Sequence, residues 1–196
     1  MEKQIILFID SGDTLIDEGT EVRDDEGVVI KADLIAGAGE ALRLIHDEGY
    51  TIALVADGNT PSFDNVYAQH RLRYCFDAWV ISETVGFQKP APQMFRTAMD
   101  QLMLSDTDKN RIVMVGNNLR RDIPGANRFG IVSVWLDWSP RYPRESRGED
   151  EIPDYVIHSP CELPSLLQNL EEAVNRGEAL KKTGFSADQI QKVQLQ

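Results

Sequence analysis

Short apolar runs alternate with helix-like stretches along most of this chain, and this alternation is what most restricts its fold. The first run, residues 4–9, is followed at once by Asp10. A continuous apolar run, as opposed to an alternating one, is typical of a strand that is covered on both faces of a parallel sheet. Later runs also end on small or polar residues. The expected architecture is therefore a parallel sheet whose strands are connected by helices.

The same periodicity places the individual elements. Strands are predicted over residues 4–9, 51–56, 78–82, 112–115, 131–136 and 155–157. Helices are predicted from residue 34 to the closing Gly49 and over residues 62–72, 93–104, 122–128 and 163–174. The polar stretch 17–33 contains a short apolar segment and predicts a small hairpin or flap. Short connections between alternating strands and helices predict an α/β fold with a doubly wound parallel sheet and right-handed crossovers.

Length and charge limit the classes of function. The chain has 196 residues, which fits a single domain, predicted over residues 1–177, followed by a polar tail or a loosely attached helix at 178–196. Its net charge of -12 argues against nucleic acid as the main partner, since phosphate-backbone binding needs a basic face. The apolar runs are too short to cross a membrane. Cys75 and Cys161 have no metal or redox spacing, and the early first strand favours a cytoplasmic protein.

Polar residues gather where four segments end at the same predicted edge of the sheet. These segments are residues 10–14, 56–59, 86–90 and 116–122. In doubly wound sheets the carboxyl ends of the strands carry the functional site. A carboxylate can attack phosphorus, a lysine can neutralise phosphoryl oxygens, and further oxygens can hold magnesium. The pattern predicts a metal-assisted phosphate site.

The stretches IDSGDTL, ADGN, GFQKPAPQMF and VMVGNNLRRDIPGANRFGI resemble, in this order, the motifs of the haloacid dehalogenase superfamily over residues 4–157. The resemblance implies a Rossmann-like, three-layer α/β/α fold and hydrolysis of a phosphate ester through an aspartyl-phosphate with Mg²⁺. Thr14, four positions after Asp10, selects Asp10 as the nucleophile. Lys89 matches the family's lysine, and Asp122 matches the later acid of its Gly-Asp-x-x-x-x-Asp motif.

The same resemblance implies two sets of binding residues. The magnesium ligands would be Asp10, the Gly12 carbonyl, Asn117 and Asp122. The phosphoryl and substrate contacts would come from Ala56, Asp57, Gly58 and Asn59. Arg141 and Arg144, in a loop after the strand 131–136, are further candidates for gripping an anionic substrate. A solvated loop, with its aromatic residues packed against the body, is the alternative for that segment.

Three positions depart from the family pattern and bear on activity. Gly12 stands where most phosphatases of the family carry a second Asp, the general acid and base. Ala56 replaces a Ser or Thr, and Asn117 replaces a direct acidic ligand of magnesium. A positioned general acid or base contributes about 10²–10⁴ in rate, so turnover is expected to be slow. The water-activating base has no assignment, and Asp13 qualifies only if the loop turns it inward.

Other roles remain open for several of these residues. Asp13, Asp57 and Asn59 are turn formers by residue type, and Asp122 could cap a helix. Only a short insertion follows the first motif, so no substantial cap domain is expected, and a second subunit or the substrate itself could roof the site. Three functions remain: a magnesium-assisted phosphatase, a binding or scaffold protein that kept the fold, and a metal-independent dehalogenase.

Overall fold

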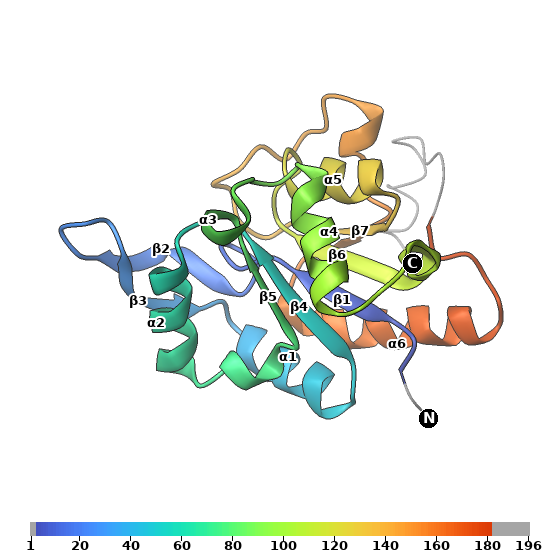
Figure 1. The fold of residues 1–196 in the computed structure, drawn as a ribbon, viewed down its shortest axis with the longest axis horizontal. Coiled ribbons are helices and arrows are strands. Elements are labelled where there is room, and N and C mark those ends of the chain that lie inside the picture. Colours follow the sequence, from blue (N-terminus) through green and yellow to red (C-terminus); the bar gives the residue numbers. More distant parts are fainter. Residues whose placement is uncertain (1–2, 182–196) are drawn as a thin grey trace.

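The structure is a computed structural model that describes residues 3–181. Six parallel strands form one sheet in the order β5-β4-β1-β6-β7-β8 (Figure 1). They are β1 (Ile6–Ile9), β4 (Thr51–Ala56), β5 (Ala78–Ile81), β6 (Ile112–Gly116), β7 (Val132–Leu136) and β8 (Tyr155–Ile157). The strands β2 (Ile16–Arg23) and β3 (Val29–Leu34) form a separate antiparallel hairpin.

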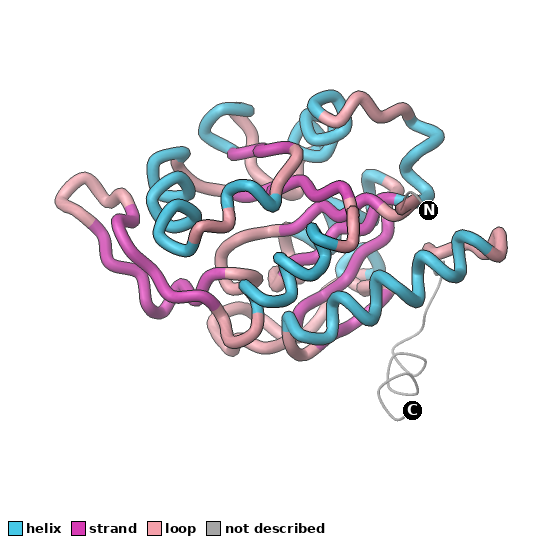
Figure 2. The backbone as a smooth tube through the Cα atoms, turned by 90° about the horizontal axis from the view of Figure 1, so that it is seen from below, coloured by secondary structure: helices cyan, strands magenta, loops and turns pink. Residues whose placement is uncertain are grey.

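Helices cover both faces of the sheet (Figure 2). They are α1 (Ala38–Asp47), α2 (Thr60–His70), α3 (Ser82–Val85), α4 (Pro92–Gln101), α5 (Asp122–Phe129) and α6 (Leu163–Asn175). Side chains of β1 alternate between two cores: Leu7 packs in the cluster that includes α1 and α6, and Phe8 packs in the cluster that includes α4 and α5. Both faces of β1 are therefore buried, which explains its continuous apolar sequence.

The strand order fixes where a site can form. From β1 the chain crosses to β4 and β5 on one side, and then returns to β6, which pairs with β1 on its other side. At this reversal the connections leave β1 and β6 in opposite directions and open a crevice at their carboxyl ends. Asp10 directly follows β1, and Asn117 directly follows β6. Both residues therefore lie at the switch point of the sheet.

The predicted parallel sheet and the predicted hairpin are confirmed, and the differences lie at element ends. The helix predicted from residue 34 begins at Ala38, because Leu34 pairs with Ile16 in the hairpin. The strand predicted to residue 82 ends at Ile81, because Ser82 begins the short helix α3, which was not predicted. An apolar or small residue at a boundary fits either neighbouring element, and tertiary pairing decides which one takes it.

The predicted tail is only partly visible. Leu180 is buried, and the Tyr155 hydroxyl donates a hydrogen bond of 2.9 Å to its carbonyl oxygen. Lys181 forms an ion pair with Asp154 at 3.1 Å. The beginning of the tail thus packs against the sheet, whereas residues 182–196 lie outside the described range.

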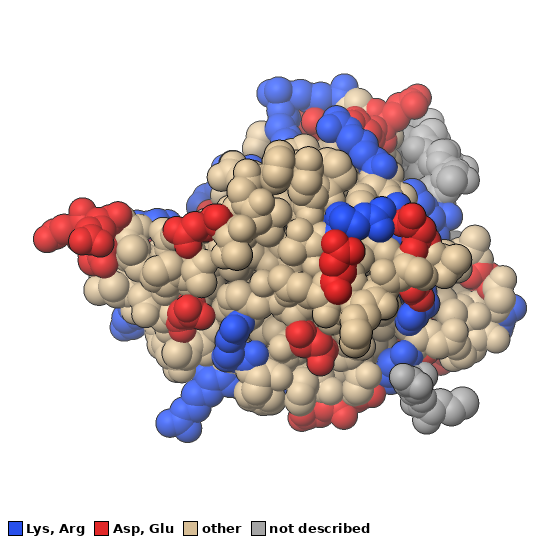
Figure 3. Space-filling view, viewed as in Figure 1, with Lys and Arg blue, Asp and Glu red and all other residues tan. Residues whose placement is uncertain are grey.

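The hairpin projects from the body, and acidic side chains gather at its tip (Figures 1 and 3). Its turn carries Asp24, Asp25 and Glu26, all exposed. Elsewhere on the face shown in Figure 3, basic and acidic side chains are interspersed. Within residues 3–181, no helix is both long and apolar enough to cross a membrane.

A buried carboxylate ties α6 to the start of β1. Glu171 accepts the backbone N–H groups of Gln4 and Ile5, at 2.8 and 3.0 Å. We expect Glu171→Leu to lower the free energy of unfolding by about 1–3 kcal/mol, because a buried N–H would lose its acceptor. Urea titration followed by circular dichroism measures the change. The neighbouring Glu172→Leu, at a side chain that is 59% exposed, should change it by less than about 0.5 kcal/mol; equal losses would contradict this role.

Candidate active site

A buried lysine connects the carboxyl ends of two strands to the start of a helix. The Lys89 ammonium lies 2.6 Å from Oδ1 of Asp10, 2.9 Å from the carbonyl oxygen of Val55 and 2.7 Å from Oδ1 of Asp122. These acceptors come from the end of β1, from β4 and from the first residue of α5. The contacts with Asp10 and Val55 are hydrogen bonds, and the contact with Asp122 is an ion pair. Lys89 is therefore fixed in place and joins the nucleophile candidate to the second acid.

Burial sets the charge state of this cluster. The Asp10 side chain is 13% exposed and the Asp122 side chain is fully buried. Burial raises the pKa of Asp10 to about 6, and the nearby Lys89 charge offsets only part of this effect. Burial lowers the pKa of Lys89, but the attraction of Asp10 and Asp122 outweighs it and the net pKa is raised. The lysine is thus charged at neutral pH, beside a carboxylate that is ionised above about pH 6.

The loop after β4 supports the lysine from its backbone side. Asp57 accepts the backbone N–H of Lys89 at 3.0 Å and pairs with Arg121 at 3.4 Å. Gly58 donates its N–H to the Ser82 hydroxyl at 2.9 Å. Asp57 and Gly58, two of the residues predicted to bind substrate, are therefore hydrogen-bonded to other residues of the protein.

Asn59 and Ala56 complete this loop. The Asn59 side chain accepts the N–H of Ser62 at 3.0 Å and caps α2. Ala56 is buried at the end of β4 and offers no side-chain polar atom where the family has a hydroxyl. Phosphoryl contacts in this loop would have to come from the backbone, and the substrate-binding role of these residues stays a prediction.

The segment after β6 supplies the second acid. Asp122 begins α5, accepts the Asn118 N–H at 2.9 Å through Oδ2, and uses Oδ1 for Lys89. It therefore both organises this loop and belongs to the charged cluster. The hydroxyl of Thr14, the residue that selects Asp10 in the sequence motif, is buried and has no hydrogen-bond partner in the part of the chain that the structure describes.

The predicted magnesium ligands lie along one pocket. Its wall includes Asp10, Gly12, Asn117 and Asp122 together with Lys89. The amide nitrogen of Asn117 is buried without a hydrogen-bond partner among residues 3–181. Within the same range there is no cluster of three or more His, Cys, Asp or Glu suited to a metal. Mg²⁺ needs only one or two carboxylates when waters and phosphate complete its oxygen shell. The donor set fits Mg²⁺ on that basis, with two acids and neutral oxygens.

Comparison with known proteins follows the same motifs. The family model described as haloacid dehalogenase-like hydrolase matches residues 3–130. The chain belongs to this family. Glyceraldehyde 3-phosphate phosphatase of Pyrococcus furiosus is 31% identical over 137 residues, which cover 70% of this chain and 54% of that protein. The chain thus spans about half the length of that relative.

Two further comparisons concern a relative by sequence and a neighbour by structure. N-acylneuraminate-9-phosphatase of Mus musculus is 38% identical over 97 residues, 49% of this chain and 37% of that protein. The crystal structure of an uncharacterized protein from Listeria monocytogenes serotype 4b superposes with a TM-score of 0.69 at 22% identity, covering 86% of this chain and 99% of that one. The second likeness supports the fold alone.

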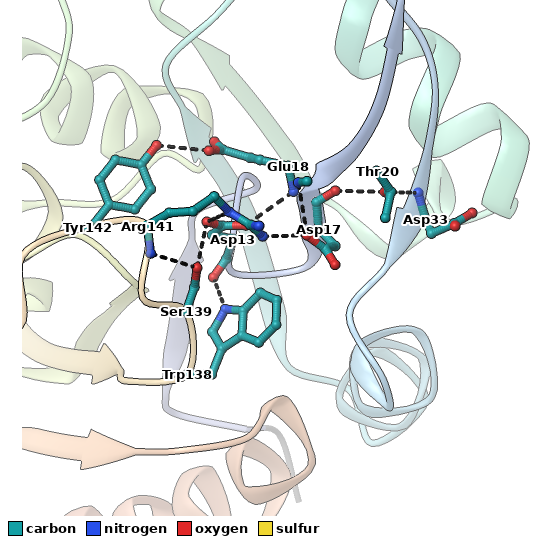
Figure 4. A network of polar contacts seen from close by, with 10 residues as sticks. Asp13, Asp17, Glu18, Thr20, Asp33, Trp138, Ser139, Arg141 and Tyr142 are labelled. Atoms are coloured by element: carbon teal, nitrogen blue, oxygen red, sulfur yellow. Dashed lines mark hydrogen bonds and ion pairs between the residues drawn. The ribbon is translucent and has the colours of Figure 1, made fainter.

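Two residues of the pocket wall lie outside the sequence motifs. Glu18, on β2, and Tyr142, in the loop after β7, line the same pocket as Asp10. The Tyr142 hydroxyl donates a hydrogen bond of 2.9 Å to Oε2 of Glu18 (Figure 4). Neither position belongs to a motif of the haloacid dehalogenase family. The only signal in the sequence was the glycine at position 12, which removes a side chain next to Asp10.

Asp13 does not line the Asp10 pocket, so it does not meet the condition for a water-activating base. Its buried carboxylate accepts hydrogen bonds from the Arg141 guanidinium at 2.6 Å and from the Ser139 hydroxyl at 3.0 Å (Figure 4). It also accepts the backbone N–H of Glu18 at 3.1 Å. Its φ of 49° is a turn conformation in which Asp is tolerated. Asp13 therefore joins the loop between β1 and β2 to the hairpin and to the loop after β7.

Both arginines predicted to grip substrate pair with acids of the same chain. Arg141 contacts Asp13 and Asp17, and Arg144 contacts Asp137 at 2.6 and 2.7 Å. The contact with Asp13 raises the pKa of the Arg141 guanidinium further above its ordinary value. An anionic substrate would have to displace these carboxylates, so substrate binding by the two arginines stays a prediction.

The raised pKa of Asp10 predicts a pH-dependent effect of Asp10→Asn on stability. Above about pH 6 the wild-type carboxylate is ionised in a buried site, which costs the native state up to about 3 kcal/mol relative to the unfolded chain. Asn resembles the protonated acid. We expect Asp10→Asn to have the higher free energy of unfolding at pH 7.5, with the difference shrinking as pH falls from 6 to 4. Denaturant titrations in EDTA measure it.

A control with the opposite sign accompanies this measurement. Hydrogen bonds from the Ser105 backbone and from Arg111 lower the pKa of Asp108 to about 2. Ionised Asp108 therefore stabilises the native state above about pH 4, and this contribution is lost as pH falls toward 2. Asp108→Asn should be less stable than wild type at pH 7.5. The same sign for both variants would contradict the assigned charge states.

Arg141 and Arg144 form a matched pair for testing the loop network. We expect Arg141→Ala to lower the free energy of unfolding by about 2–4 kcal/mol, because a fully buried Asp13 carboxylate loses its cation while Arg141 itself is 38% exposed. Arg144→Ala, at a side chain that is 55% exposed, should cost less than about 1 kcal/mol. Thermal and urea unfolding measure both. A larger loss for Arg144→Ala would overturn this difference.

Proposed function

We propose that this chain hydrolyses a phosphate monoester by transferring the phosphoryl group to Asp10 and then to water. The observation that carries the proposal is the buried contact of Asp10 with Lys89, which also holds Asp122, at the switch point of the sheet. A haloacid dehalogenase-like family model and relatives named as phosphatases support it.

The charged cluster suits nucleophilic attack. Lys89 takes Oδ1 of Asp10, so the other carboxylate oxygen is available to attack phosphorus. The ammonium donates hydrogen bonds to Asp10 and to the Val55 carbonyl and is paired with Asp122, so Lys89 acts mainly through its charge and through the position it gives Asp10. The phosphoryl oxygens would gain electrostatic stabilisation from this fixed cation as negative charge builds on them.

Magnesium is the proposed cofactor. Asp10, Asp122, Asn117 and the Gly12 carbonyl would hold it, and when bound it would neutralise phosphoryl charge. With Asn117 in place of an acid, the site has one negative charge fewer than the family pattern, and affinity for the cation is expected to be lower. The buried ion pair of Lys89 and Asp122 would remain whether or not the cation is bound.

The substrate class follows from the neighbouring pocket. A second pocket shares Gly12, Glu18 and Asp57 with the Asp10 pocket, and it continues along Glu21 and Arg23 of the hairpin to Phe63 of α2. The leaving group of a bound ester would occupy this mixed polar and apolar space. The named relatives act on glyceraldehyde 3-phosphate and on an N-acylneuraminate 9-phosphate, both small hydroxylated esters. We propose a small polar phosphate ester as substrate.

A binding or scaffold protein is the second candidate. It is favoured by the buried methyl group of Ala56 where the family has a hydroxyl, and by the neutral Asn117. Such a protein would keep the pocket and bind an anion without turning it over.

The deciding experiment is hydrolysis of 4-nitrophenyl phosphate by wild type and Asp10→Asn, each with Mg²⁺ and with EDTA. We expect slow, Mg²⁺-dependent turnover by wild type that falls to background in Asp10→Asn, because Asn cannot form the acyl phosphate. Release of 4-nitrophenol measures the rate.

The matched control is Asp33→Asn, an exposed acid on the hairpin, which should keep the wild-type rate. Far-ultraviolet circular dichroism verifies the fold of each variant. Background rates in wild type, together with Mg²⁺-independent binding of inorganic phosphate, would favour the binding protein over the phosphatase.

A further inference from the structure

The space beside Gly12 is filled by another acid. A Cβ atom built on Gly12 would lie 2.1 Å from Oε1 of Glu18 and 2.9 Å from its carboxyl carbon. Such distances do not occur between non-bonded atoms. A side chain at position 12 and the Glu18 carboxylate in its observed position therefore exclude each other. The carboxylate of Glu18 thus lies where the first atoms of the missing aspartate side chain would lie.

We propose that Glu18 is the general acid and base of this active site and replaces the aspartate that Gly12 lacks. The proposal rests on the phosphoryl transfer to Asp10 proposed above. Glu18 belongs to β2 of the hairpin, six positions beyond Gly12, and its carboxylate reaches the pocket from a different element than the usual residue.

Several contacts hold Glu18 in this position. The Tyr142 hydroxyl donates to Oε2 at 2.9 Å, which leaves Oε1 on the side of Gly12 (Figure 4). The backbone N–H of Glu18 donates to Asp13, whose carboxylate is in turn fixed by Arg141. Both the side chain and the backbone of Glu18 are therefore anchored. A catalytic group needs such support to keep a productive position.

The proton balance of the two steps is complete with this one residue. In the first step an Asp10 oxygen bonds to phosphorus, the bond from phosphorus to the ester oxygen breaks, and protonated Glu18 gives its proton to the departing alkoxide. In the second step Glu18 carboxylate takes a proton from water as the water oxygen bonds to phosphorus. The bond between Asp10 and phosphorus then breaks, which regenerates the Asp10 carboxylate and protonated Glu18 and releases phosphate.

The test uses aryl phosphates with different leaving groups on wild type and Glu18→Gln. Phenoxide needs a proton to leave, whereas 2,4-dinitrophenolate does not. We expect Glu18→Gln to slow hydrolysis of phenyl phosphate by about 10²–10⁴-fold. With 2,4-dinitrophenyl phosphate we expect a rapid burst of one equivalent of dinitrophenol and then slow turnover, because the phosphoenzyme forms but its hydrolysis lacks a base.

A rescue experiment separates chemistry from structure. Glu18→Ala should lose activity, and the double variant Gly12→Asp/Glu18→Ala should regain at least tenfold, since the vacated space accepts the aspartate. Gly12→Asp alone should not gain, because the new side chain and the Glu18 carboxylate compete for the same space. Glu26→Gln, at the exposed hairpin turn, is the matched control and should leave the rates unchanged.

The outcomes distinguish this proposal from the proposed function. If wild-type hydrolysis depends on Asp10 but Glu18→Gln shows no dinitrophenol burst and equal losses on both substrates, or shows no loss at all, the role of Glu18 is overturned and the phosphatase is kept. Failure of the double variant to recover, with its fold intact, would also count against Glu18. Background rates in wild type on every aryl phosphate would overturn both proposals.

Discussion

The arrangement of this molecule depends on one buried ammonium group. Lys89 is satisfied by Asp10, Asp122 and the Val55 carbonyl, so it joins the ends of β1 and β4 to the start of α5. Asp122, whose side chain is fully buried, keeps this ammonium paired with a charge even when Asp10 is neutral. The site and the fold are thus linked: the contacts that position Asp10 for attack are also the contacts that hold the carboxyl edge of the sheet together.

A second network extends this rigidity to the hairpin. Arg141, from the loop after β7, binds both Asp13 of the loop between β1 and β2 and Asp17 at the beginning of the hairpin. The Trp138 indole also donates to the Asp13 carbonyl. These contacts bring together segments that are more than a hundred positions apart in the chain. A hairpin of only two strands is marginal on its own, and its anchoring here lets Glu18 reach the pocket in a fixed orientation.

Seen in three dimensions, the departures from the family motifs have different surroundings. Gly12 removes a carboxylate, but the same absence makes room for Glu18. Asn117 is neutral where the family pattern has an acid, while Asp122 remains fully buried against Lys89. Ala56 has no such compensation among the described residues, since the loop that follows it uses its polar groups on Lys89, Ser82 and Ser62.

The sequence by itself determined the parallel sheet, the order of strands and helices, and the segments that meet at the site. Buried strands and amphipathic helices leave periodic patterns that depend on neighbours in the chain, and the motif around Asp10 and Thr14 is equally local. For that reason the strand over Thr51–Ala56 and the placement of Asp10 followed from the sequence alone.

Only the tertiary structure decided how the side chains at that edge are used. Contacts between the hairpin, the loop between β1 and β2, and the loop after β7 decide three features of the site. They decide whether Asp13 faces the pocket, whether Arg141 is free, and whether Glu18 reaches Gly12. These segments carry no periodic pattern, and identical residue types would fit a solvated loop. Their roles are set by the burial and pairing of charges across long sequence separations, which is a property of the folded chain.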